Sequence, residues 1–336
     1  MTTTHTIQDW DYESCYRGRP VVITGGAGFI GSHLARRLVA LGAEVCVIDD
    51  LSGGSLDHLK EVESSVRFVH GSILDPDSLC SAFAGCDLVF HEAALASVPA
   101  SIEEPARYHE VNATGTLRVL EEARKRNVSR LVFASSSSVY GDQPSLPKRE
   151  TDRPDPLSPY AMQKLTGEYL LDVWHRCYDM STISLRYFNI FGPGQSADSA
   201  YAAVVAAFAT ALLKGEAPRI FGNGGATRDF TFIDNVVQAN LRAGAIGEDE
   251  LRTNLKGRPA IFNVAVAVQT SVLELANAMI EVTGSDVEPM FGPERAGDVL
   301  HSLADISLIE EVLGYQPTVG LAEGLKPTME WYREQS

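Results

Sequence analysis

One segment near the start of this chain sets the expected fold: Val21-Val22-Ile23-Thr24-Gly25-Gly26-Ala27-Gly28-Phe29-Ile30-Gly31. A β-branched run ends in a glycine cluster, which opens into residues 32–39 with the apolar spacing of a helix packed on a sheet. Glycine lets the backbone approach a pyrophosphate closely, and the helix that follows points its free N–H groups at the anion. The segment therefore predicts a dinucleotide site rather than an ordinary strand-to-helix turn.

The chain beyond this segment alternates apolar strand patterns with helical ones. The second apolar run ends in Asp49-Asp50, where a carboxylate is expected on the adenosine ribose hydroxyls. The alternation predicts an α/β, Rossmann-like, doubly wound parallel sheet. Strands are expected at 20–24, 44–48, 66–69, 87–90, 130–134, 181–186, 261–264 and near 289–291, and helices at 29–41, 76–84, 104–126 and 159–178.

The alternation breaks after Asn189, where loops rich in glycine and proline begin. We expect an N-terminal extension packed on the outside (1–19), a dinucleotide-binding domain (20–188) and a smaller C-terminal substrate-binding lobe (189–336) with excursions back to the main sheet. Ligands of open α/β sheets bind beyond the carboxyl ends of the strands. The cleft between the lobes is therefore the predicted site.

Composition excludes several classes of protein. The net charge of −16 argues against nucleic acid as a partner, because phosphate contacts need Lys and Arg. No apolar run approaches the roughly 20 residues of a membrane helix, and the first residues lack a signal-peptide core, so we expect a cytoplasmic protein without a membrane partner. The five scattered cysteines contain no C-x-x-C pair, which indicates neither a disulfide framework nor a metal site.

The strongest catalytic signal is Ser158-Pro159-Tyr160-Ala161-Met162-Gln163-Lys164. Serine followed by proline is typical of a helix start, which puts Tyr160 and Lys164 one turn apart on one face. A free tyrosine has a pKa of about 10, and a neighbouring ammonium or nicotinamide cation favours the phenolate. We expect Tyr160 to act as a base toward a sugar hydroxyl. For this pair alone, an exposed Tyr and Lys on an amphipathic helix remains the alternative.

A second polar motif, Ser135-Ser136-Ser137-Ser138, directly follows a predicted strand. Four serines at the carboxyl end of a strand place several hydroxyls at the predicted cleft. The alternative is a polar strand-to-loop turn. Together with the glycine cluster and the Tyr160–Lys164 pair, however, the serines form a recognisable set of motifs.

This set resembles the extended short-chain dehydrogenase/reductase superfamily, and within it the nucleotide-sugar 4-epimerases, closest to those acting on UDP-N-acetylglucosamine. The resemblance covers residues 20–333. It also includes His91-Glu92-Ala93-Ala94, Val111-Asn112-Ala113-Thr114-Gly115-Thr116, Leu185-Arg186-Tyr187-Phe188-Asn189, Arg228-Asp229-Phe230 and Arg295-Ala296-Gly297-Asp298.

The resemblance implies NAD as the cofactor. Lys164 would position the nicotinamide ribose, and Asp49 favours NAD over NADP because a 2′-phosphate would meet a carboxylate. The implied cofactor-binding residues are Gly25, Gly28, Phe29, Ile30, Gly31, Asp49, Ala93, Asn112, Tyr160, Lys164 and Tyr187.

The resemblance also implies a UDP-sugar substrate. Ser136 would hydrogen-bond the reacting hydroxyl, with Tyr160 and Lys164 completing the catalytic set. Arginine suits a diphosphate independently, because its guanidinium binds phosphate oxygens in a fixed fork. The implied substrate-binding residues are Ser97, Ser136, Ser137, Tyr160, Asn189, Gln195, Ala203, Arg228, Arg295, Asp298 and Ser302.

One departure from related sugar dehydratases is informative. They carry an Asp-Glu pair where this chain has Ser137 and Ser138, and eliminating water needs an acid and a base in place. Redox-neutral inversion at C4 through a transient 4-keto sugar is therefore expected.

The position of Ser302 bears on the choice of sugar. In the family, the residue seven after the arginine of Arg295-Ala296-Gly297-Asp298 limits the size of the sugar. A serine leaves room for a 2-acetamido group, and residues 94–99 and 195–203 resemble enzymes that prefer acetylated sugars. We expect interconversion of UDP-N-acetylglucosamine and UDP-N-acetylgalactosamine, with UDP-glucose as a secondary substrate.

Two other functions remain open. Within enzymes, the alternative is a 4-epimerase of UDP-glucuronic acid or its N-acetylated form. Outside enzymes, it is a non-catalytic NAD-binding regulatory protein on the same fold. The family resemblance further implies a homodimer formed by the helices expected at 104–126 and 159–178.

Overall fold

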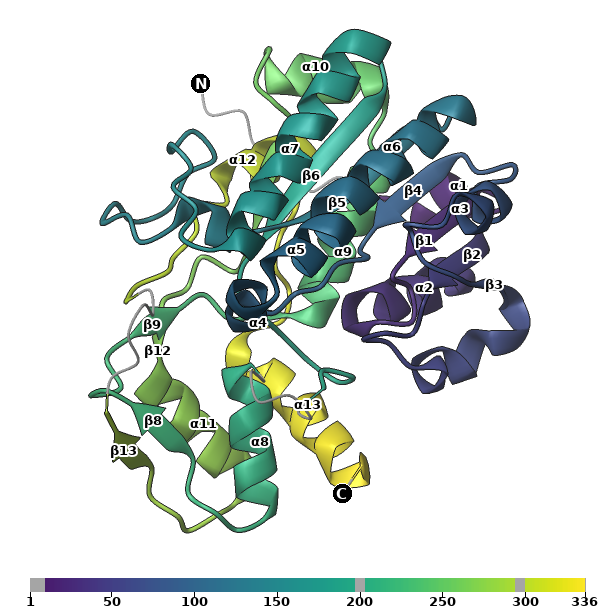
Figure 1. The fold of residues 1–336 in the computed structure, drawn as a ribbon. Helices are drawn as coiled ribbons and strands as arrows, with labels where there is room; N and C mark the ends of the chain where they lie inside the picture. Colours follow the sequence, from purple (N-terminus) through teal and green to yellow (C-terminus); the bar gives the residue numbers. More distant parts are fainter. Residues whose placement is uncertain (1–9, 197–202, 294–299, 336) are drawn as a thin grey trace.

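The computed structural model describes residues 10–196, 203–293 and 300–335, and it builds the chain around one seven-stranded sheet (Figure 1). The strand order is β3-β2-β1-β4-β5-β6-β11, and the pairings are parallel. The predicted doubly wound parallel sheet is confirmed. The strands are β1 (Pro20–Thr24), β2 (Glu44–Asp49), β3 (Val66–His70), β4 (Leu88–His91), β5 (Arg130–Ser136), β6 (Ser181–Tyr187) and β11 (Ile261–Val264).

Helices cover both faces of this sheet, which explains why its central strands are apolar along their length. Val21 and Ile23 of β1 belong to one buried cluster, and Val22 between them belongs to the other. The first face is covered by α2 (Phe29–Ala40) and α9 (Ile233–Ala245), and the second by α3 (Pro76–Ala82), α6 (Gly115–Lys125) and α7 (Pro159–Tyr178).

The single helix expected at 104–126 is interrupted. The structure forms α5 (Pro105–His109), a π-helical turn η2 (Glu110–Thr114) and then α6. Asn112 lies in the widened turn, where its side chain is buried and bonds to the backbone of Leu95. A π-turn adds a residue to the helical circuit. This turn thereby directs Asn112 toward the loop after β4.

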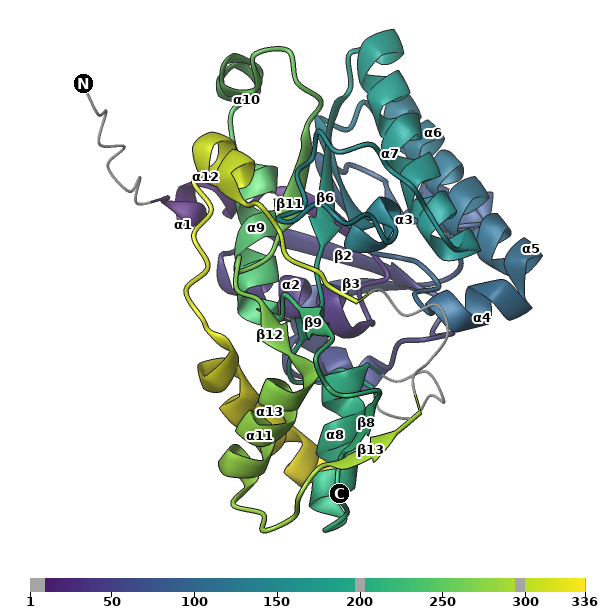
Figure 2. The same cartoon turned by 90° about the vertical axis from the view of Figure 1, so that its left-hand side faces the viewer.

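The C-terminal half forms a smaller lobe beyond one end of the sheet (Figure 2). β8 pairs with β13 in parallel and β9 pairs with β12 in antiparallel fashion. β11 and α9 belong to this half of the chain but return to the main sheet. The lobe contains α8 (Val204–Leu213), β8 (Arg219–Phe221), β9 (Thr227–Arg228), β12 (Thr270–Ser271), α11 (Val272–Thr283), β13 (Met290–Gly292) and α13 (Leu321–Gln335).

Short elements connect these parts: η1 (Leu56–Ser65), α4 (Val98–Glu103), η3 (Ser137–Tyr140), β7 (Ile190–Phe191), β10 (Thr231–Phe232), α10 (Glu248–Leu255) and α12 (Ser307–Leu313). Among them, β7 pairs with β10 in parallel. Within the described ranges, no helix combines the length and apolarity needed to cross a bilayer.

The described part of the N-terminal extension is more deeply packed than the sequence suggested. It forms α1 (Tyr12–Tyr16), and the side chain of Tyr16 is fully buried. The Tyr16 hydroxyl donates to the carbonyl oxygen of Leu241 at 2.6 Å. Gly244 makes room for it, since a Cβ there would lie 2.5 Å from the hydroxyl. The extension is thus anchored on α9.

Candidate active site

The glycine loop between β1 and α2 is closely packed against neighbouring backbone. Gly25 has a φ of +70°, and a Cβ there would lie 2.7 Å from the backbone of Ala93. A Cβ on Gly31 would lie 2.4 Å from the carbonyl oxygen of Gly25. Gly28 precedes the first turn of α2 and offers no capping side chain. The free N–H groups of that turn are therefore left available to an anion.

A cavity of about 300 Å³ lies beside this loop. Asp49 stands in its wall at the end of β2, and its carboxylate accepts hydrogen bonds from the N–H groups of Ala27 (2.9 Å) and Leu51 (2.8 Å). Burial raises the pKa of Asp49. The cavity gathers the predicted residues Gly25, Gly28, Phe29, Ile30, Gly31, Asp49 and Ala93, with Asp50 of the Asp49-Asp50 motif beside them. It also includes Ser52, Gly53, Gly54, Gly71, Ser72 and Ile73, which sequence reasoning missed.

The helix that carries Tyr160 and Lys164 begins as predicted. Ser158 caps α7 by accepting from the N–H of Ala161 at 3.1 Å, and Pro159 takes the first helical position. The Lys164 Nζ lies 5.8 Å from the centre of the Tyr160 ring and donates to the carbonyl oxygen of Ala134 at 2.7 Å. Both side chains are buried, at 9% and 4% exposed. The pair therefore faces the carboxyl end of β5 rather than solvent.

The ionisation of this pair differs from the sequence-based expectation. Burial raises the pKa of Tyr160 to about 12, and a hydrogen bond with Ser136 opposes that rise. Burial lowers the pKa of Lys164 to about 8, and the negative charge of Glu92 opposes that fall. The expected lowering of the Tyr160 pKa is thus outweighed in the free chain by loss of solvation. A base role requires further positive charge in the loaded site.

The serine motif leaves β5 and enters the short turn η3. The Ser136 Oγ accepts from the Ser138 N–H (3.2 Å) and hydroxyl (2.9 Å). Ser135 points the other way and donates to the buried carboxylate of Glu168 on α7. Arg186 of β6 donates to both oxygens of that carboxylate, at 2.8 and 2.7 Å. This buried ion pair fixes the serine strand against the catalytic helix.

Two predicted cofactor residues use their polar groups within the protein. Asn112 accepts from the Leu95 N–H at 2.8 Å and donates to the oxygens of Leu95 and Gln163. The Tyr187 hydroxyl donates to Glu92 at 2.9 Å and accepts from Asn240 at 2.8 Å. Both residues therefore support the loop that follows β4.

The predicted substrate residues are spread over several loops. Ser97 caps α4 by accepting from the Ala100 N–H at 3.2 Å. Gln195 donates to the carbonyl oxygen of Ile190 at 3.0 Å. Asn189 and Ala203 are exposed, and Ser137 begins η3. Arg295 and Asp298 lie outside the described residues.

The structure brings Arg228 and Ser302 together in the C-terminal lobe. The carbonyl oxygen of Thr227 accepts from the Ser302 N–H at 3.1 Å and from the Arg228 guanidinium at 2.8 Å. Asp229 is buried beside them and accepts from the Ala304 N–H at 3.3 Å. Burial raises the pKa of Asp229 to about 6. Asp229 thus fixes the segment that carries Ser302, a role that sequence reasoning missed.

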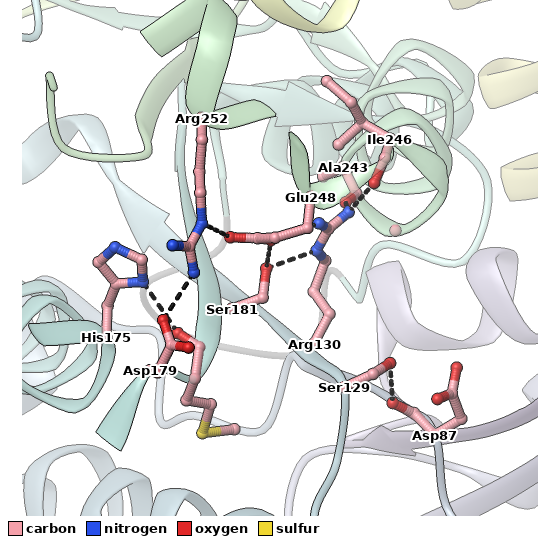
Figure 3. Close-up of polar contacts among 12 residues, drawn as sticks. Asp87, Ser129, Arg130, His175, Asp179, Ser181, Ala243, Ile246, Glu248 and Arg252 are labelled. Atoms are coloured by element: carbon pink, nitrogen blue, oxygen red, sulfur yellow. Dashed lines mark hydrogen bonds and ion pairs between the residues drawn. The ribbon is translucent and has the colours of Figure 1, made fainter. Parts of the chain in front are cut away.

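A cavity of about 380 Å³ lies at the opposite, amino-terminal ends of β6 and β11. Its charged groups bind one another (Figure 3): Glu248 accepts from Arg130 at 2.9 Å and from Arg252 at 2.7 Å, and Ser181 also donates to it. Partial burial would raise the pKa of Glu248, but these hydrogen bonds lower it to about 2. Because these charged groups are paired with one another, we assign the cluster around Glu248 a role in stabilising the fold.

Known proteins share both the sequence and this architecture. The NAD dependent epimerase/dehydratase family matches residues 21–265. A UDP-glucose 4-epimerase of Mycolicibacterium smegmatis is 41% identical over 94% of this chain and 99% of its own. The structure of a UDP-N-acetylglucosamine 4-epimerase from Methanobrevibacter ruminantium, in complex with UDP-N-acetylmuramic acid, is 35% identical with a TM-score of 0.89, covering 95% of this chain and 100% of that one.

A third similar protein was solved with its cofactor. The structure of a UDP-glucuronic acid 4-epimerase from Bacillus cereus, in complex with UDP-glucuronic acid and NAD, is 30% identical with a TM-score of 0.83. It covers 94% of this chain and 100% of that one.

Proposed function

This chain belongs to the NAD-dependent epimerase/dehydratase family, and we propose that it is a UDP-sugar 4-epimerase interconverting UDP-N-acetylglucosamine and UDP-N-acetylgalactosamine. One observation carries the proposal. Tyr160, Lys164 and Ser136 meet at the carboxyl end of β5, while the two positions after Ser136 are serines. This site can move a proton at a sugar hydroxyl but lacks the acid and base that elimination requires at those positions.

The residues around the glycine loop fit NAD. The absence of side chains at Gly25 and Gly31 lets the loop pack closely on the backbone of Ala93 and of Gly25 itself. The first turn of α2 would then offer its N–H groups to a pyrophosphate. Asp49 would hold the adenosine ribose and disfavour a 2′-phosphate. Lys164 uses one N–H on Ala134 and keeps two for the nicotinamide ribose. Bound NAD would accept the C4 hydride and return it to the opposite face.

The proton chemistry falls to the chain's own side chains. Tyr160 takes the proton of the 4-hydroxyl as the C4–H bond breaks, and the sugar becomes a 4-ketone. After the keto sugar rotates to present its opposite face, Tyr160 returns the proton to O4, so no proton is gained or lost. Ser136 hydrogen-bonds O4 in both directions. Burial raises the pKa of Tyr160 in the free chain. The charges of Lys164 and of a bound nicotinamide ring would act in the opposite direction and favour the phenolate.

The small side chain of Ser302 supports the proposal of an acetylated sugar. A serine side chain occupies little space, and its segment is fixed by the backbone of Thr227 and the carboxylate of Asp229. Arg228 on the adjoining strand would bind the diphosphate. For the keto sugar to rotate, the site must bind the nucleotide firmly and leave room around the sugar. UDP-glucose, being smaller, would fit as a secondary substrate.

A 4-epimerase of UDP-glucuronic acid or its N-acetylated form is the alternative. The similarity to the Bacillus cereus enzyme supports it. The two candidates differ in the group at C6, and turnover of each sugar distinguishes them.

The reaction in deuterated water tests the proposed chemistry. A hydride lent and returned within the site keeps the original hydrogen at C4, because a carbon-bound hydride does not exchange with solvent. We expect C4 epimer without deuterium at C4, with no NAD added. Deuterium at C4 would indicate deprotonation at carbon instead and would refute the proposed mechanism.

We also propose a homodimer through α6 and α7. Leu117 on α6 and Tyr169 and Val173 on α7 are large apolar side chains with 37%, 59% and 46% of their surface exposed. They lie on adjacent helices of one face (Figure 1). Burial of such a patch favours association. Sedimentation should show a dimer for the wild type and a monomer for Tyr169→Glu, and a wild-type monomer at micromolar concentration would refute the proposal.

A further inference from the structure

The segment of residues 189–196 follows β6 and lies against the first two turns of α2. Gly194 has a φ of +86°, and a Cβ there would lie 3.7 Å from the Phe29 ring and 3.8 Å from the Nε2 of His33. Phe29 also lines the cavity beside the glycine loop. The 189–196 segment therefore reaches the part of α2 at which we place the pyrophosphate.

The His33 side chain attaches this segment to α2. Its Nε2 lies 2.8 Å from the carbonyl oxygen of Pro193. Because a carbonyl oxygen can only accept, Nε2 carries the proton and donates. The imidazole also meets the Phe29 ring edge to face, with the ring centres 5.8 Å apart. One side chain thus contacts both a residue of the cofactor cavity and the backbone of the 189–196 segment.

His33 makes this hydrogen bond as a neutral imidazole at neutral pH. Burial lowers the pKa of His33 to about 4, and the charge of Arg36 acts in the same direction, while the bond to Pro193 opposes the fall. Since the ring is uncharged, a neutral amide with the same reach is a fair replacement for it.

Two other contacts hold the ends of the 189–196 segment. The carbonyl oxygen of Asn189 accepts from the Thr231 N–H at 2.9 Å, where β7 runs beside β10. The Tyr332 hydroxyl on α13 donates to the carbonyl oxygen of Gln195 at 2.5 Å. His33 acts between these two points, at Pro193, and is the contact that ties the segment to the cofactor helix.

The 189–196 segment stands on the substrate side of the proposed site. It leaves the carboxyl end of β6, where Tyr187 lies beside Ser136 of β5. Ligands of open α/β sheets bind beyond these strand ends. The segment also carries Asn189 and Gln195, which the family resemblance assigns to the nucleotide sugar. A loop that is ordered before its ligand arrives lowers the entropic cost of binding.

We propose that His33 is a positioning residue, which holds the 189–196 segment on the cofactor helix in the conformation that binds the nucleotide sugar. The inference rests on the proposed function and links its cofactor and substrate sites. His33 acts through the Pro193 carbonyl. Loss of that hydrogen bond should therefore weaken binding of the nucleotide and leave the chemical step at Tyr160 unchanged.

Three substitutions of His33 separate the reach of the side chain from its polarity. Glutamine carries an amide N–H at about the distance of Nε2 from the backbone, asparagine withdraws it by one methylene, and leucine has no donor. His33→Gln should therefore restore the bond to Pro193, whereas His33→Asn and His33→Leu should lose it.

The first readout is the affinity for UDP, measured by calorimetry on NAD-loaded protein. We expect His33→Asn and His33→Leu to bind UDP about three- to tenfold more weakly, which is the size of one lost hydrogen bond. KM for the sugar should rise alike, with kcat and bound NAD unchanged, and His33→Gln should match the wild type. Equal UDP affinity in all four proteins would overturn the proposal. Loss of NAD from folded His33→Asn would also overturn it, because His33 would then act on the cofactor.

Hydrogen exchange of the segment is the second readout and uses no substrate. Peptides covering residues 189–196 should exchange faster in His33→Asn than in the wild type, and at the wild-type rate in His33→Gln. Peptides from α10 serve as the control and should not change. Unchanged exchange of the segment in His33→Asn would contradict the proposal.

Tyr332→Phe covers the case in which the His33 variants fail to fold. It removes the hydroxyl that donates to Gln195 and keeps the ring, so UDP binding should weaken and exchange of the 189–196 segment should rise. No change in either would overturn the proposal. A wild type that binds no UDP and converts no UDP-sugar would refute the proposed function. Unchanged UDP affinity in variants of an active wild type would refute the role of His33 alone.

Discussion

Lys164 lies one helical turn after Tyr160, with its Nζ 5.8 Å from the centre of the phenol ring and 2.7 Å from the carbonyl oxygen of Ala134. The distance to the ring is short enough for the ammonium to act on the phenol through the low dielectric of a buried site. The bond to Ala134 ties the lysine to β5, directly before the serine motif. The helix and the strand thus bring base, lysine and serine into one unit.

Tyr160→Phe should reduce turnover about 10²- to 10⁴-fold, because the loss of a general base costs that much. Fold and bound NAD should persist, since phenylalanine keeps the buried ring. Steady-state kinetics with measurement of NAD content checks this. Tyr169→Phe is the matched control on the same helix, where the side chain is 59% exposed. Near-normal turnover of Tyr160→Phe would favour the non-catalytic NAD-binding function instead.

Gly31→Ala should remove NAD from the purified protein. The added Cβ would lie 2.4 Å from the Gly25 carbonyl oxygen, so the backbone of the loop must move. Gly320→Ala adds the same methyl group where nothing lies within 4 Å, and should keep the cofactor. Absorbance of NAD released from equal amounts of folded protein measures the difference. A full complement of NAD in Gly31→Ala would show that the loop does not hold the pyrophosphate.

Ser302→Tyr should abolish turnover of the acetamido sugar, by at least about 100-fold in kcat/KM, and spare UDP-glucose. A tyrosine ring would occupy the room that we propose the small serine leaves for the acetamido group, on a segment held by Thr227 and Asp229. A loss of this size corresponds to about 2.7 kcal/mol of transition-state binding. Ser302→Ala is the control and should leave the ratio of the two substrates unchanged. Equal losses on both sugars would contradict the size argument.

Glu248→Gln should destabilise the protein at neutral pH but not in acid. The pKa of Glu248 is about 2 in the folded chain against an ordinary value of 4.5. A lowered pKa stabilises the fold above the unfolded value, and this contribution disappears as the pH falls from about 4.5 to about 2. The Tm difference from wild type should shrink over that window. A constant difference would contradict the assignment, and the exposed Glu330→Gln should show none.

Features carried by local sequence were predicted well. The helix start at Ser158-Pro159 placed Tyr160 and Lys164 on α7, and the distance from the glycine cluster to Asp49 placed that carboxylate at the cavity. Tyr160 and Lys164 are four positions apart on one helix, and the glycine cluster and Asp49 follow two paired parallel strands. In both cases the spacing along the sequence determines the position in the fold.

Contacts between distant residues could not be predicted in this way. The Tyr187 hydroxyl meets a carboxylate 95 positions away and an amide 53 positions away. Only the assembly of the sheet, in which β5 lies between β4 and β6, and the packing of α9 against β6 bring these groups together. The same applies to Tyr16, whose partner Leu241 lies 225 positions away. The burial that raises the pKa of Tyr160 in the free chain could not be predicted for a related reason, because the degree of burial depends on the whole fold.

Conversion of UDP-sugars by the purified chain, with no NAD added, tests the proposed activity. UDP-N-acetylglucosamine, UDP-glucose and UDP-glucuronic acid would be incubated separately and their C4 epimers followed by NMR. We expect rapid formation of UDP-N-acetylgalactosamine, slower formation of UDP-galactose, and no product from UDP-glucuronic acid. Product from UDP-glucuronic acid alone, or no epimer from any of the three, would contradict the proposed activity.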